Sequence, residues 1–523
     1  MKRLRTHFWA ALVSVLALVS LSSAPAHADS ATADSGSEPR PRGFPGGVTE
    51  ALGGGFEARQ DIDHSDSRRR HGANSSIVAR WNSIAIDASG LDHTPVAVGE
   101  SRVFGEQLGP ARSSRAMAIV HIAMFDAMNA VVRRYRGYAS ALRAAPGTSM
   151  DAAIAQAARD SLVALFPSQA PAFDAALVED LARIRNVRAR DLGVALGQRT
   201  AAAILARRSA DGSSHAEPVL GVGFNPSNLP GKWRQDPISR VPIAVGARWE
   251  EVRPFTMRSA EQFRLAPPPT LGSAAYAAAY EEVMRLGGDG ITTPTRRTAE
   301  QTFIGVFWAY DGTPSLCAPP RLYNQVAMQI ARQRRTDDVE LLRLLALLNT
   351  AMADTAIAAW ESKYHYQVWR PVTGIRESDA GTGPTGAGDG NPATSGDAQF
   401  MPLGAPASNL NGPNFTPPFP AYPSGHAAFG GALFQTLRQF YGRDDIRFTF
   451  VSDEYNGETR DNEGNVREYH PRSFRSLSEA ELENAQSRIY LGIHWAFDAT
   501  EGIRQGRKVA RHVFRAAFQP LDD

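Results

Sequence analysis

The sequence predicts an all-α protein built from two helical bundles. Apolar residues recur at intervals of three and four over most of the chain beyond residue 75, which is typical of amphipathic and buried helices. Stretches rich in proline and glycine separate these segments. The chain has 523 residues, of which 43% are hydrophobic and 21% charged, so it is long enough for two packed cores of ordinary composition.

The periodic segments give the helices in order. We expect helices over residues 116–132, 151–166, 172–185, 190–205, 274–286, 297–309, 321–334, 337–366, 425–441, 478–492 and 496–518. The pattern leaves open whether His494 continues the helix at 478–492 or begins the next. His121 lies in an apolar stripe between Met117 and Phe125, so we interpret it as a core histidine and not as a ligand.

Three interruptions rich in proline, glycine or polar residues separate the helices. Residues 218–270 are expected to join the two helical halves. Residues 379–423 lead directly into a Pro-Ser-Gly-His sequence, so we expect them to form the rim of a pocket and to carry Phe419 into it. The polar stretch 453–475 is either a lid or a solvated insertion, and we favour an insertion.

The beginning of the chain predicts export. Lys2, Arg3 and Arg5 precede an apolar run over residues 8–21, and Ala26-His-Ala28 is a small-x-small cleavage sequence. Residues 1–28 are therefore predicted to be a secretory signal peptide and the mature protein to be secreted, the alternative being an uncleaved anchor. No later stretch reaches about 18 uninterrupted apolar residues, so we expect no stable membrane insertion after cleavage.

The remaining boundaries follow from composition. Residues 29–75 are rich in Gly, Ser, Asp and Arg and are predicted to be flexible. Residues 76–260 would form an N-terminal helical bundle, and residues 261–523 a C-terminal bundle that carries the functional site. Cys317 is the single cysteine, which excludes an intrachain disulfide, and the net charge of +2 gives no reason to expect a nucleic-acid partner.

Three short motifs in the last third of the chain supply the groups that a tetrahedral oxyanion needs. The first runs from Lys363 to Arg370 and Pro371, and the third comprises Ser487-Arg488, His494 and Asp498. Lys363, Arg370 and Arg488 offer three cations, and charged donors make the strongest hydrogen bonds to anions. Taken one at a time, such residues are usually solvated or ion-paired surface groups, so it is the coincidence of the motifs that indicates a site.

The second motif, Pro423-Ser424-Gly425-His426, adds neutral donors. Ser424 can donate its hydroxyl, and Gly425 has no side chain to block the approach of a ligand to its N–H. The motif lies between a proline-rich loop and an apolar run, so its amides are expected at a helix N-terminus, where an anion is favoured. On its own, a Ser-Gly pair is usually only a turn or a cap.

The spacing within the other two motifs predicts how their side chains are presented. Trp360, Lys363, Gln367 and Arg370 follow each other at helical intervals, which would place both cations on one face of a helix that ends near Pro371. His494 and Asp498 are one turn apart, so Asp498 is expected to orient the imidazole. Arg488 is about a third of a turn away from His494, and only its length would bring it to the same pocket.

These motifs match a known signature. Lys-x6-Arg-Pro, Pro-Ser-Gly-His and Ser-Arg-x5-His-x3-Asp are shared by type 2 phosphatidic acid phosphatases, bacterial class A acid phosphatases and vanadium haloperoxidases. Beyond the motifs, residues 307–312, 319–325 and 417–431 closely resemble the fungal vanadium chloroperoxidases. The resemblance extends from about residue 307 to about residue 498 and is faint before it.

The resemblance implies a vanadate cofactor, with hydrogen peroxide and chloride or bromide as substrates and, where one is used, an organic acceptor. His494 would be the metal ligand, and His426 the acid–base group. Trp360 and Phe419 would form the halide pocket. The residues expected to hold the vanadate oxygens are Lys363, Arg370, Ser424, Gly425 and Arg488. Lys363 would also polarise the peroxide, and Asp311 would pair with Arg488 and count among the catalytic residues.

Two other functions use the same groups. In a phosphatase, His494 would attack a phosphoester and His426 would protonate the leaving alcohol. We favour the haloperoxidase because Trp360 and Phe419 would enclose a small apolar niche, whereas a phosphatase needs an open, polar approach for its leaving group. A protein that stores or transports an oxyanion would need the cations but would leave His426 and the two aromatic residues without a role.

Overall fold

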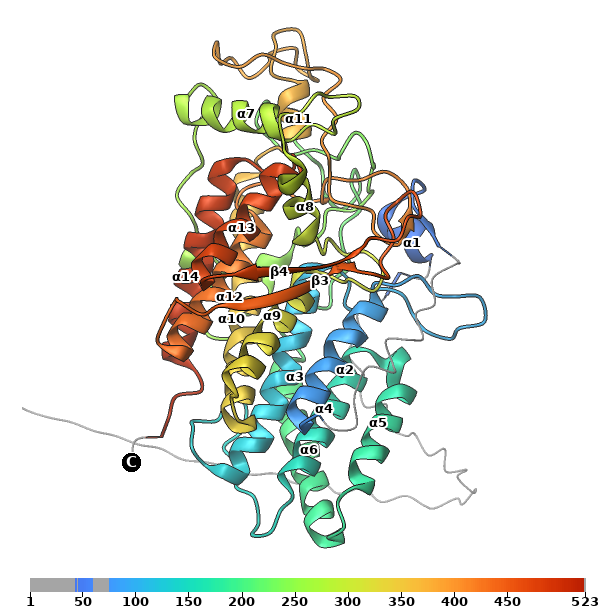
Figure 1. Ribbon diagram of the computed structural model, residues 1–523, viewed down its shortest axis with the longest axis vertical. Coiled ribbons are helices and arrows are strands. Elements are labelled where there is room, and N and C mark those ends of the chain that lie inside the picture. Colours follow the sequence, from blue (N-terminus) through green and yellow to red (C-terminus); the bar gives the residue numbers. More distant parts are fainter. Residues whose placement is uncertain (1–42, 45, 60–74, 522–523) are drawn as a thin grey trace, which may run out of the picture. The chain divides into compact units, whose positions relative to one another are not determined.

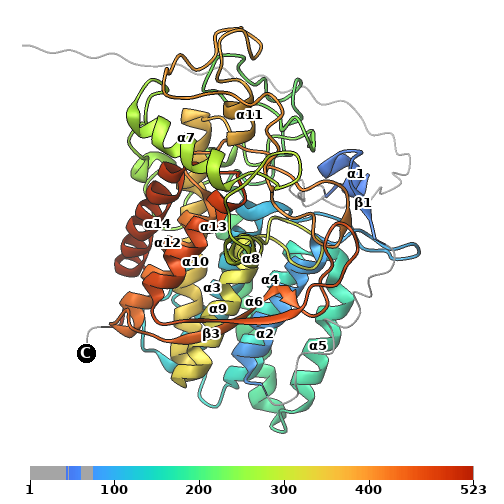
Figure 2. The same cartoon turned by 45° about the horizontal axis from the view of Figure 1, so that its top comes forward.

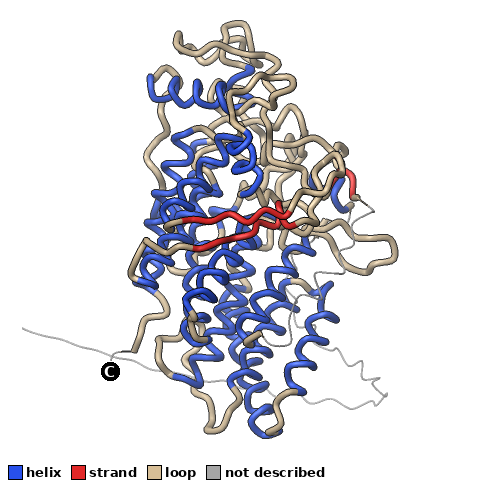
Figure 3. The backbone as a smooth tube through the Cα atoms, in the orientation of Figure 1, coloured by secondary structure: helices blue, strands red, loops and turns tan. Residues whose placement is uncertain are grey.

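The computed structural model describes residues 43–44, 46–59 and 75–521. Helices dominate the described part, and loops gather beyond one end of them (Figure 1, Figure 3). The predicted all-α class is therefore confirmed. The predicted signal peptide, residues 1–28, lies outside the described residues.

The first half of the chain contributes six helices of the described part. They are α1 (Gly47–Leu52), α2 (Ile77–Asp92), α3 (Gly109–Val132), α4 (Met150–Leu165), α5 (Ala170–Ala182) and α6 (Val187–Arg208). The second half contributes α7 (Ala274–Leu286), α8 (Ala299–Phe307), α9 (Pro319–Arg334), α10 (Asp338–Tyr366), α11 (Pro371–Arg376), α12 (Gly425–Tyr441), α13 (Leu477–Tyr490) and α14 (Ala496–Ala516).

Two long apolar helices, α3 and α10, lie against each other at the centre of the core, with α4 and α6 packed together on one side and α12 and α14 on the other (Figure 2). Both α3 and α10 are long and apolar enough to cross a membrane. The most apolar windows of these helices are 89% and 94% buried inside the protein, as is usual for core helices. Their hydrophobicity is therefore used in the packing of the core.

Three sequence expectations need correction. Helix α2 was not expected, although Ser76 caps it by accepting a hydrogen bond from the Ala79 N–H. The segment 29–75 was expected to be flexible, but it contains α1, and strand β1 (Glu57–Ala58) pairs with β2 (Leu410–Asn411). The stretch 453–475 was expected to be a solvated insertion, but parts of it belong to two paired strands.

That stretch takes part in an antiparallel hairpin, with β3 (Phe448–Asn456) paired to β4 (Tyr469–Phe474). Alternate residues of β3 are buried, including Ser452 and Glu454, so one face of the hairpin packs on the helices. The alternation is short and includes polar residues, so the sequence showed no clear strand pattern here.

His121 is a core histidine, as expected. It is fully buried, with Nδ1 2.8 Å from the carbonyl oxygen of Met117 and Nε2 3.0 Å from the Asn82 side chain. Burial lowers the pKa of His121 to about 4.

A neutral His121 predicts acid-sensitive stability. In the unfolded chain a histidine binds its proton near pH 6.5, whereas the folded protein resists protonation down to about pH 4. The free energy of unfolding should therefore fall by up to about 3 kcal/mol through this residue as the pH drops from 6.5 to 4. Denaturant unfolding of wild type and His121→Gln at pH 7, 5.5 and 4.5 measures this contribution, and equal losses in both proteins would contradict it.

Candidate functional site

The first motif is divided between a helix and the connection after it. Lys363 lies in the last turn of α10, which ends at Tyr366 because Gln367 adopts a left-handed conformation with φ of 54°. Arg370 lies beyond that end, and Pro371 is the first residue of the short helix α11. The expectation that Lys363 and Arg370 share one helical face is therefore wrong, because the chain turns between them.

The second motif begins a helix, as expected. Ser424 caps α12, and its hydroxyl oxygen accepts a hydrogen bond from the Ala427 N–H. The hydroxyl proton of Ser424 remains available as a donor. A side chain at Gly425 would begin 3.3 Å from the indole ring of Trp360, so a glycine keeps this helix N-terminus close to that ring.

The third motif spans two helices. Arg488 lies near the end of α13, His494 lies in the turn that follows, and Asp498 lies in the first turn of α14. Because the chain turns after α13, the helical phase expected between Arg488 and His494 does not apply. The expected orienting contact of Asp498 is present, since Asp498 Oδ2 accepts from His494 Nδ1 at 2.8 Å and from the Trp495 N–H at 2.9 Å.

The geometry assigns the tautomer of His494. Arg370 Nη1 lies 2.9 Å from His494 Nε2, and a guanidinium group can only donate. Nε2 therefore carries the lone pair and Nδ1 the proton. Burial, followed by the positive charges of Arg370 and Lys363, holds the pKa of His494 well below its usual range, so the imidazole is neutral with its lone pair turned toward the arginine.

The two arginines present donors that no protein atom accepts. Arg370 donates through Nε to the carbonyl of Phe419 and through Nη1 to the carbonyl of Ile493, both at 2.8 Å, while Nη2 has no partner. Arg488 donates through Nη2 to Asp311 at 2.6 Å, while Nε and Nη1 have none. Both side chains are at most 1% exposed. Buried donors without acceptors are costly, which indicates that a ligand rich in oxygen completes this site.

Asp311 therefore acts through Arg488. Its carboxylate forms the ion pair expected from the sequence, and both side chains are buried. Burial raises the pKa of Asp311, and the Arg488 charge opposes that rise. We assign Asp311 as a residue that positions Arg488, in place of the catalytic role expected from the sequence.

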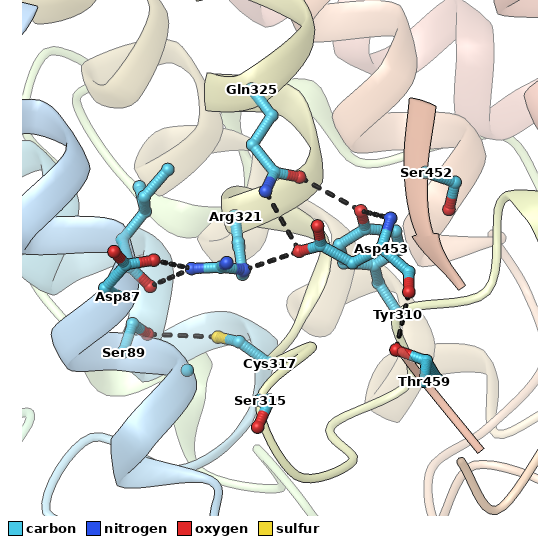
Figure 4. Close-up of polar contacts among 12 residues, drawn as sticks. Asp87, Ser89, Tyr310, Ser315, Cys317, Arg321, Gln325, Ser452, Asp453 and Thr459 are labelled. Carbon is cyan, nitrogen blue, oxygen red and sulfur yellow. Dashed lines mark hydrogen bonds and ion pairs between the residues drawn. The ribbon is translucent and has the colours of Figure 1, made fainter. Parts of the chain in front are cut away.

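A polar network holds the segment that carries Asp311 (Figure 4). The Tyr310 hydroxyl donates to the Gln325 side chain at 3.0 Å and accepts from the Asp453 N–H at 2.6 Å. Arg321 binds the Asp453 carboxylate at 2.8 Å and that of Asp87 at 2.6 Å. Helices α2 and α9 and strand β3 are thereby joined around the segment next to Asp311.

His426 lies in the first turn of α12. Its Nε2 contacts the carbonyl oxygen of Ala309, which places the proton of the neutral ring on Nε2 and the lone pair on Nδ1. Burial, together with the charge of Arg488, holds the pKa of His426 well below its usual range. Tyr323 and Asn484 fix the beginning of this helix by donating to the carbonyl oxygen of His426 at 2.9 and 3.0 Å.

Lys363 has a different immediate environment from the arginines. Its ammonium group donates to the carbonyls of Pro420 and Ala421, at 2.8 and 3.1 Å, and to that of Pro423. Burial and the Arg370 charge lower the pKa of Lys363, but three carbonyl acceptors match the three protons of a charged ammonium, so we assign the charged form. Lys363 thus fastens the loop that leads into Ser424, and a direct contact with an anion requires that it exchange one of these bonds.

Trp360 and Phe419 form an aromatic wall beside these cations. The centres of the two rings are 5.0 Å apart. The Phe419 ring lies 5.0 Å from Lys363 Nζ and 5.0 Å from the guanidinium carbon of Arg370. Both aromatic side chains therefore lie beside positive charge.

A cavity of about 70 Å³ connects the cationic and aromatic parts of the site. Its polar lining includes Asp311, His426, Arg488 and His494, together with Gly425. Its hydrophobic lining includes Trp360 and Phe419 and other residues from separate parts of the chain: Leu52, Leu108, Ile243, Val245, Phe415 and Phe429. The cavity has room for a group of a few heavy atoms, since one water occupies about 30 Å³ in the liquid.

These observations fit a tetrahedral oxyanion such as vanadate. Three buried guanidinium donors lack acceptors, the amides of Gly425 and His426 lie at a helix N-terminus, and a neutral imidazole turns its lone pair toward Arg370. An imidazole is a reasonable single donor to vanadium, and the cations supply the outer hydrogen bonds. Seven of the site residues named from the sequence line the cavity: Asp311, Trp360, Phe419, Gly425, His426, Arg488 and His494. Lys363, Arg370 and Asp498 do not line it but contact Phe419 or His494, and Ser424 directly precedes Gly425 in the chain.

Several contacts of the site were invisible in the sequence because they are made by main-chain atoms. The carbonyl of Ala309 binds His426, and the carbonyl of Val245 accepts from the Trp360 indole N–H at 3.0 Å. Every residue has a carbonyl, so residue type carries no signal of this kind. Tyr310 and Tyr323 were also missed, although both lie in segments that resemble the fungal enzymes.

Comparison with known proteins agrees with this site. Residues 343–523 match a family model described as the VCPO second helical-bundle domain. The chain is 31% identical over 510 residues to the vanadium chloroperoxidase of Curvularia inaequalis, covering 82% of this chain and 79% of that protein.

Two solved structures share the fold. A bacterial vanadium-dependent iodoperoxidase has a TM-score of 0.66 and 24% identity, covering 86% of this chain and 99% of that one. A holo-type bacterial vanadium-dependent chloroperoxidase has a TM-score of 0.59 and 16% identity, covering 88% and 98%. The motifs, the fold and the extent of the similarity lead to one conclusion: this chain belongs to the vanadium haloperoxidase family.

Proposed function

We propose that this protein is a vanadate-dependent haloperoxidase that oxidises chloride and bromide with hydrogen peroxide. The products are hypohalous acid or, with an organic acceptor, halogenated molecules. The observation that carries the proposal is the convergence of His494 Nε2 with three unpartnered guanidinium donors beside the aromatic wall. A phosphatase site needs the same donors but has no use for that wall.

Each residue of the site has a distinct part in the proposal. His494 binds vanadium through Nε2, the nitrogen that carries its lone pair, and Asp498 keeps the proton on Nδ1. Arg370 and Arg488 hold vanadate oxygens with their free donors, and Ser424 and Gly425 add a hydroxyl and an amide. When bound, vanadate acts as a Lewis acid that activates hydrogen peroxide toward attack by a halide.

His426 moves the proton. Its Nε2 proton is held by the Ala309 carbonyl, so Nδ1 is free to accept a proton from peroxide and later to return it. Burial and the cations around His426 hold its pKa below the ordinary value. An anion bound in the cage offsets the charge of those cations and so opposes this lowering of the pKa. Lys363 adds positive charge at the boundary between the anion and the aromatic wall.

Trp360 and Phe419 select the halide in this proposal. Their rings and the cations beside them offer a monovalent anion positive charge with little competing water. The relatives include a chloroperoxidase and an iodoperoxidase, so the choice between halides depends on local structure within a shared fold. The order of preference is therefore a property to be measured on this chain.

Removal of vanadate tests the proposal most simply. Protein loaded with vanadate should halogenate an activated phenol in the presence of peroxide and bromide or chloride, and the metal-free protein should not. Phosphomonoester hydrolysis is assayed on the same two samples. Halogenation that does not depend on vanadate would contradict the proposal, and hydrolysis by the metal-free protein without halogenation by the loaded protein would establish the phosphatase.

We also propose that the protein is exported, on the basis of the leader sequence in residues 1–28. Peroxide and halide are both available outside the cell. The N-terminal residue of protein recovered from the culture medium tests this proposal, which requires a start at residue 29.

A further inference from the structure

The connection between the two halves of the chain contacts both parts of the aromatic wall, Trp360 itself and the residue that precedes Phe419. Val245, in the segment 218–270, donates its N–H to the carbonyl of Pro418 at 3.0 Å, next to Phe419. The carbonyl of Val245 accepts from the Trp360 indole at 3.0 Å and from the Tyr364 hydroxyl at 2.9 Å. One residue thus joins the supports of Trp360 and Phe419.

The same contact determines what Trp360 offers a ligand. Its indole N–H is already donated to Val245, so it is not free to bind a halide. Trp360 then contributes only the surface and the positive edge of its ring. What Trp360 offers a halide therefore depends on where its ring lies relative to the ring of Phe419. The centres of the two rings are 5.0 Å apart.

Gly246 holds the main chain directly against Trp360. It has φ of 73°, a conformation that favours glycine. A Cβ atom at this position would overlap Cδ1 and Nε1 of the indole and lie 3.2 Å from Cγ. Trp360 is 1% exposed and is packed against Phe419 and Phe429, so an added Cβ atom would force the indole to shift against these rings or into the cavity that it lines.

A buried ion pair between Arg112 and Glu217 anchors this segment through the Gly246 N–H. Glu217 accepts from the Gly246 N–H at 2.6 Å through one oxygen and from Arg112 Nε at 3.2 Å through the other. The side chains of Arg112 and Glu217 are 8% and 4% exposed. Arg112 belongs to α3, so the position of Gly246 is tied to a central helix of the core.

We propose that the Val245–Gly246 segment, anchored by Glu217, is a positioning element that sets the spacing of Trp360 and Phe419 and thereby the halide selectivity of the enzyme. This inference rests on the proposed haloperoxidase function. The residues bind no halide themselves. They act by fixing the position of the Trp360 indole relative to Phe419.

The physical argument predicts which halide is most sensitive. Chloride is smaller and more strongly hydrated than iodide, so it gives up more hydration on binding and depends more on close contacts in its site. Iodide is larger, polarisable and easier to oxidise, and it tolerates a looser wall. Displacing Trp360 should therefore reduce turnover of chloride more than turnover of iodide.

Gly246→Ala is the main variant, and Gly386→Ala is its control. Gly386 has a similar φ of 68°, but a Cβ there meets nothing within 4 Å, so this control carries the backbone strain without the contact to Trp360. In Gly246→Ala we expect the ratio of kcat/KM for chloride to that for iodide to fall by at least about tenfold, the scale on which pockets respond to one methyl group. The ratio in Gly386→Ala should equal that of wild type.

A second readout needs neither vanadate nor turnover. The indole N–H of Trp360 gives a resonance in ¹⁵N-tryptophan-labelled metal-free protein, assigned by its loss in Trp360→Phe. We expect this resonance to shift and to exchange faster with solvent in Gly246→Ala, because the bond to Val245 is broken or lengthened. It should be unchanged in Gly386→Ala, and the affinity for vanadate, measured by calorimetry, should stay within about twofold of wild type.

Glu217 supplies a second pair of variants if Gly246→Ala fails to fold. Glu217→Ala removes the acceptor of the Gly246 N–H, whereas Glu217→Gln retains an oxygen for it. Glu217→Ala should lower the chloride-to-iodide ratio, and Glu217→Gln should restore most of it. Tyr364, which shares the Val245 carbonyl, is unchanged in all these variants.

The outcomes separate this inference from the proposed function. An active wild type, together with folded Gly246→Ala and Glu217→Ala proteins that keep its halide ratio and its Trp360 resonance, would overturn the inference alone. A vanadate-loaded wild type that oxidises neither chloride nor bromide would overturn the proposed function and the inference with it. A lower ratio accompanied by the shifted resonance supports the inference.

Discussion

Replacing His494 with alanine should abolish both vanadate retention and halogenation. His494 is the residue of the cage whose neutral nitrogen, Nε2, turns a lone pair toward Arg370 Nη1, on the guanidinium group whose Nη2 has no partner. Without it, the cations still attract an anion but cannot fix it by a coordinate bond. We expect halide oxidation to fall to the background of free vanadate, and vanadium content after gel filtration to fall to a small fraction of that of wild type.

The control is His470→Ala. His470 lies on β4 with about half of its side chain exposed, away from the cavity-lining residues, so its loss removes an imidazole without touching the cage. Its vanadium content and turnover should match those of wild type. A fully active His494→Ala enzyme that retains vanadium would refute the ligand assignment.

Arg488→Met should weaken vanadate binding by about 100-fold or more. Arg488 supplies two of the three buried guanidinium donors of the site that have no protein acceptor, and each hydrogen bond from a charged group contributes about 1.5 to 3 kcal/mol. The substitution also leaves the Asp311 carboxylate buried without its partner, which costs about 3 to 5 kcal/mol of stability. Calorimetry with vanadate and denaturant unfolding measure the two effects separately.

Two further variants isolate the contribution of Arg488 to binding. The double variant Asp311→Asn with Arg488→Met removes both charges, so it should recover much of the stability while binding vanadate as weakly as Arg488→Met. Arg475→Met removes an arginine whose side chain is 85% exposed and should change neither property. Near-normal vanadate affinity in the folded double variant would show that Arg488 is not part of the cage.

The sequence predicted most of the long helices because each buries an apolar stripe on its own. The segments 274–286 and 425–441 were predicted with the bounds that the structure gives. Boundaries set by capping and by left-handed residues were less accessible. The end of α10 at Tyr366 was predicted by the periodic pattern, but no property of Gln367 signalled the left-handed conformation that turns the chain before Arg370.

The members of the site were predictable because their chemistry is distinctive, whereas their arrangement was not. Three cations, two histidines and a Ser-Gly pair in one order identified the cage, but helical spacing gave an incorrect geometry for Arg370 and Arg488. The bonds of Lys363 to three carbonyls and the bond of Trp360 to Val245 depend on which loops fold over α10. Such contacts follow from tertiary packing and not from local pattern.

The location of vanadium in crystals grown with vanadate tests the central claim most directly, because vanadium can be identified by its anomalous X-ray scattering. The account predicts one strong peak within bonding distance of His494 Nε2, with Arg370 and Arg488 directed toward its oxygens. Vanadium bound at another place, or a cage that stays empty at saturating vanadate, would contradict the account.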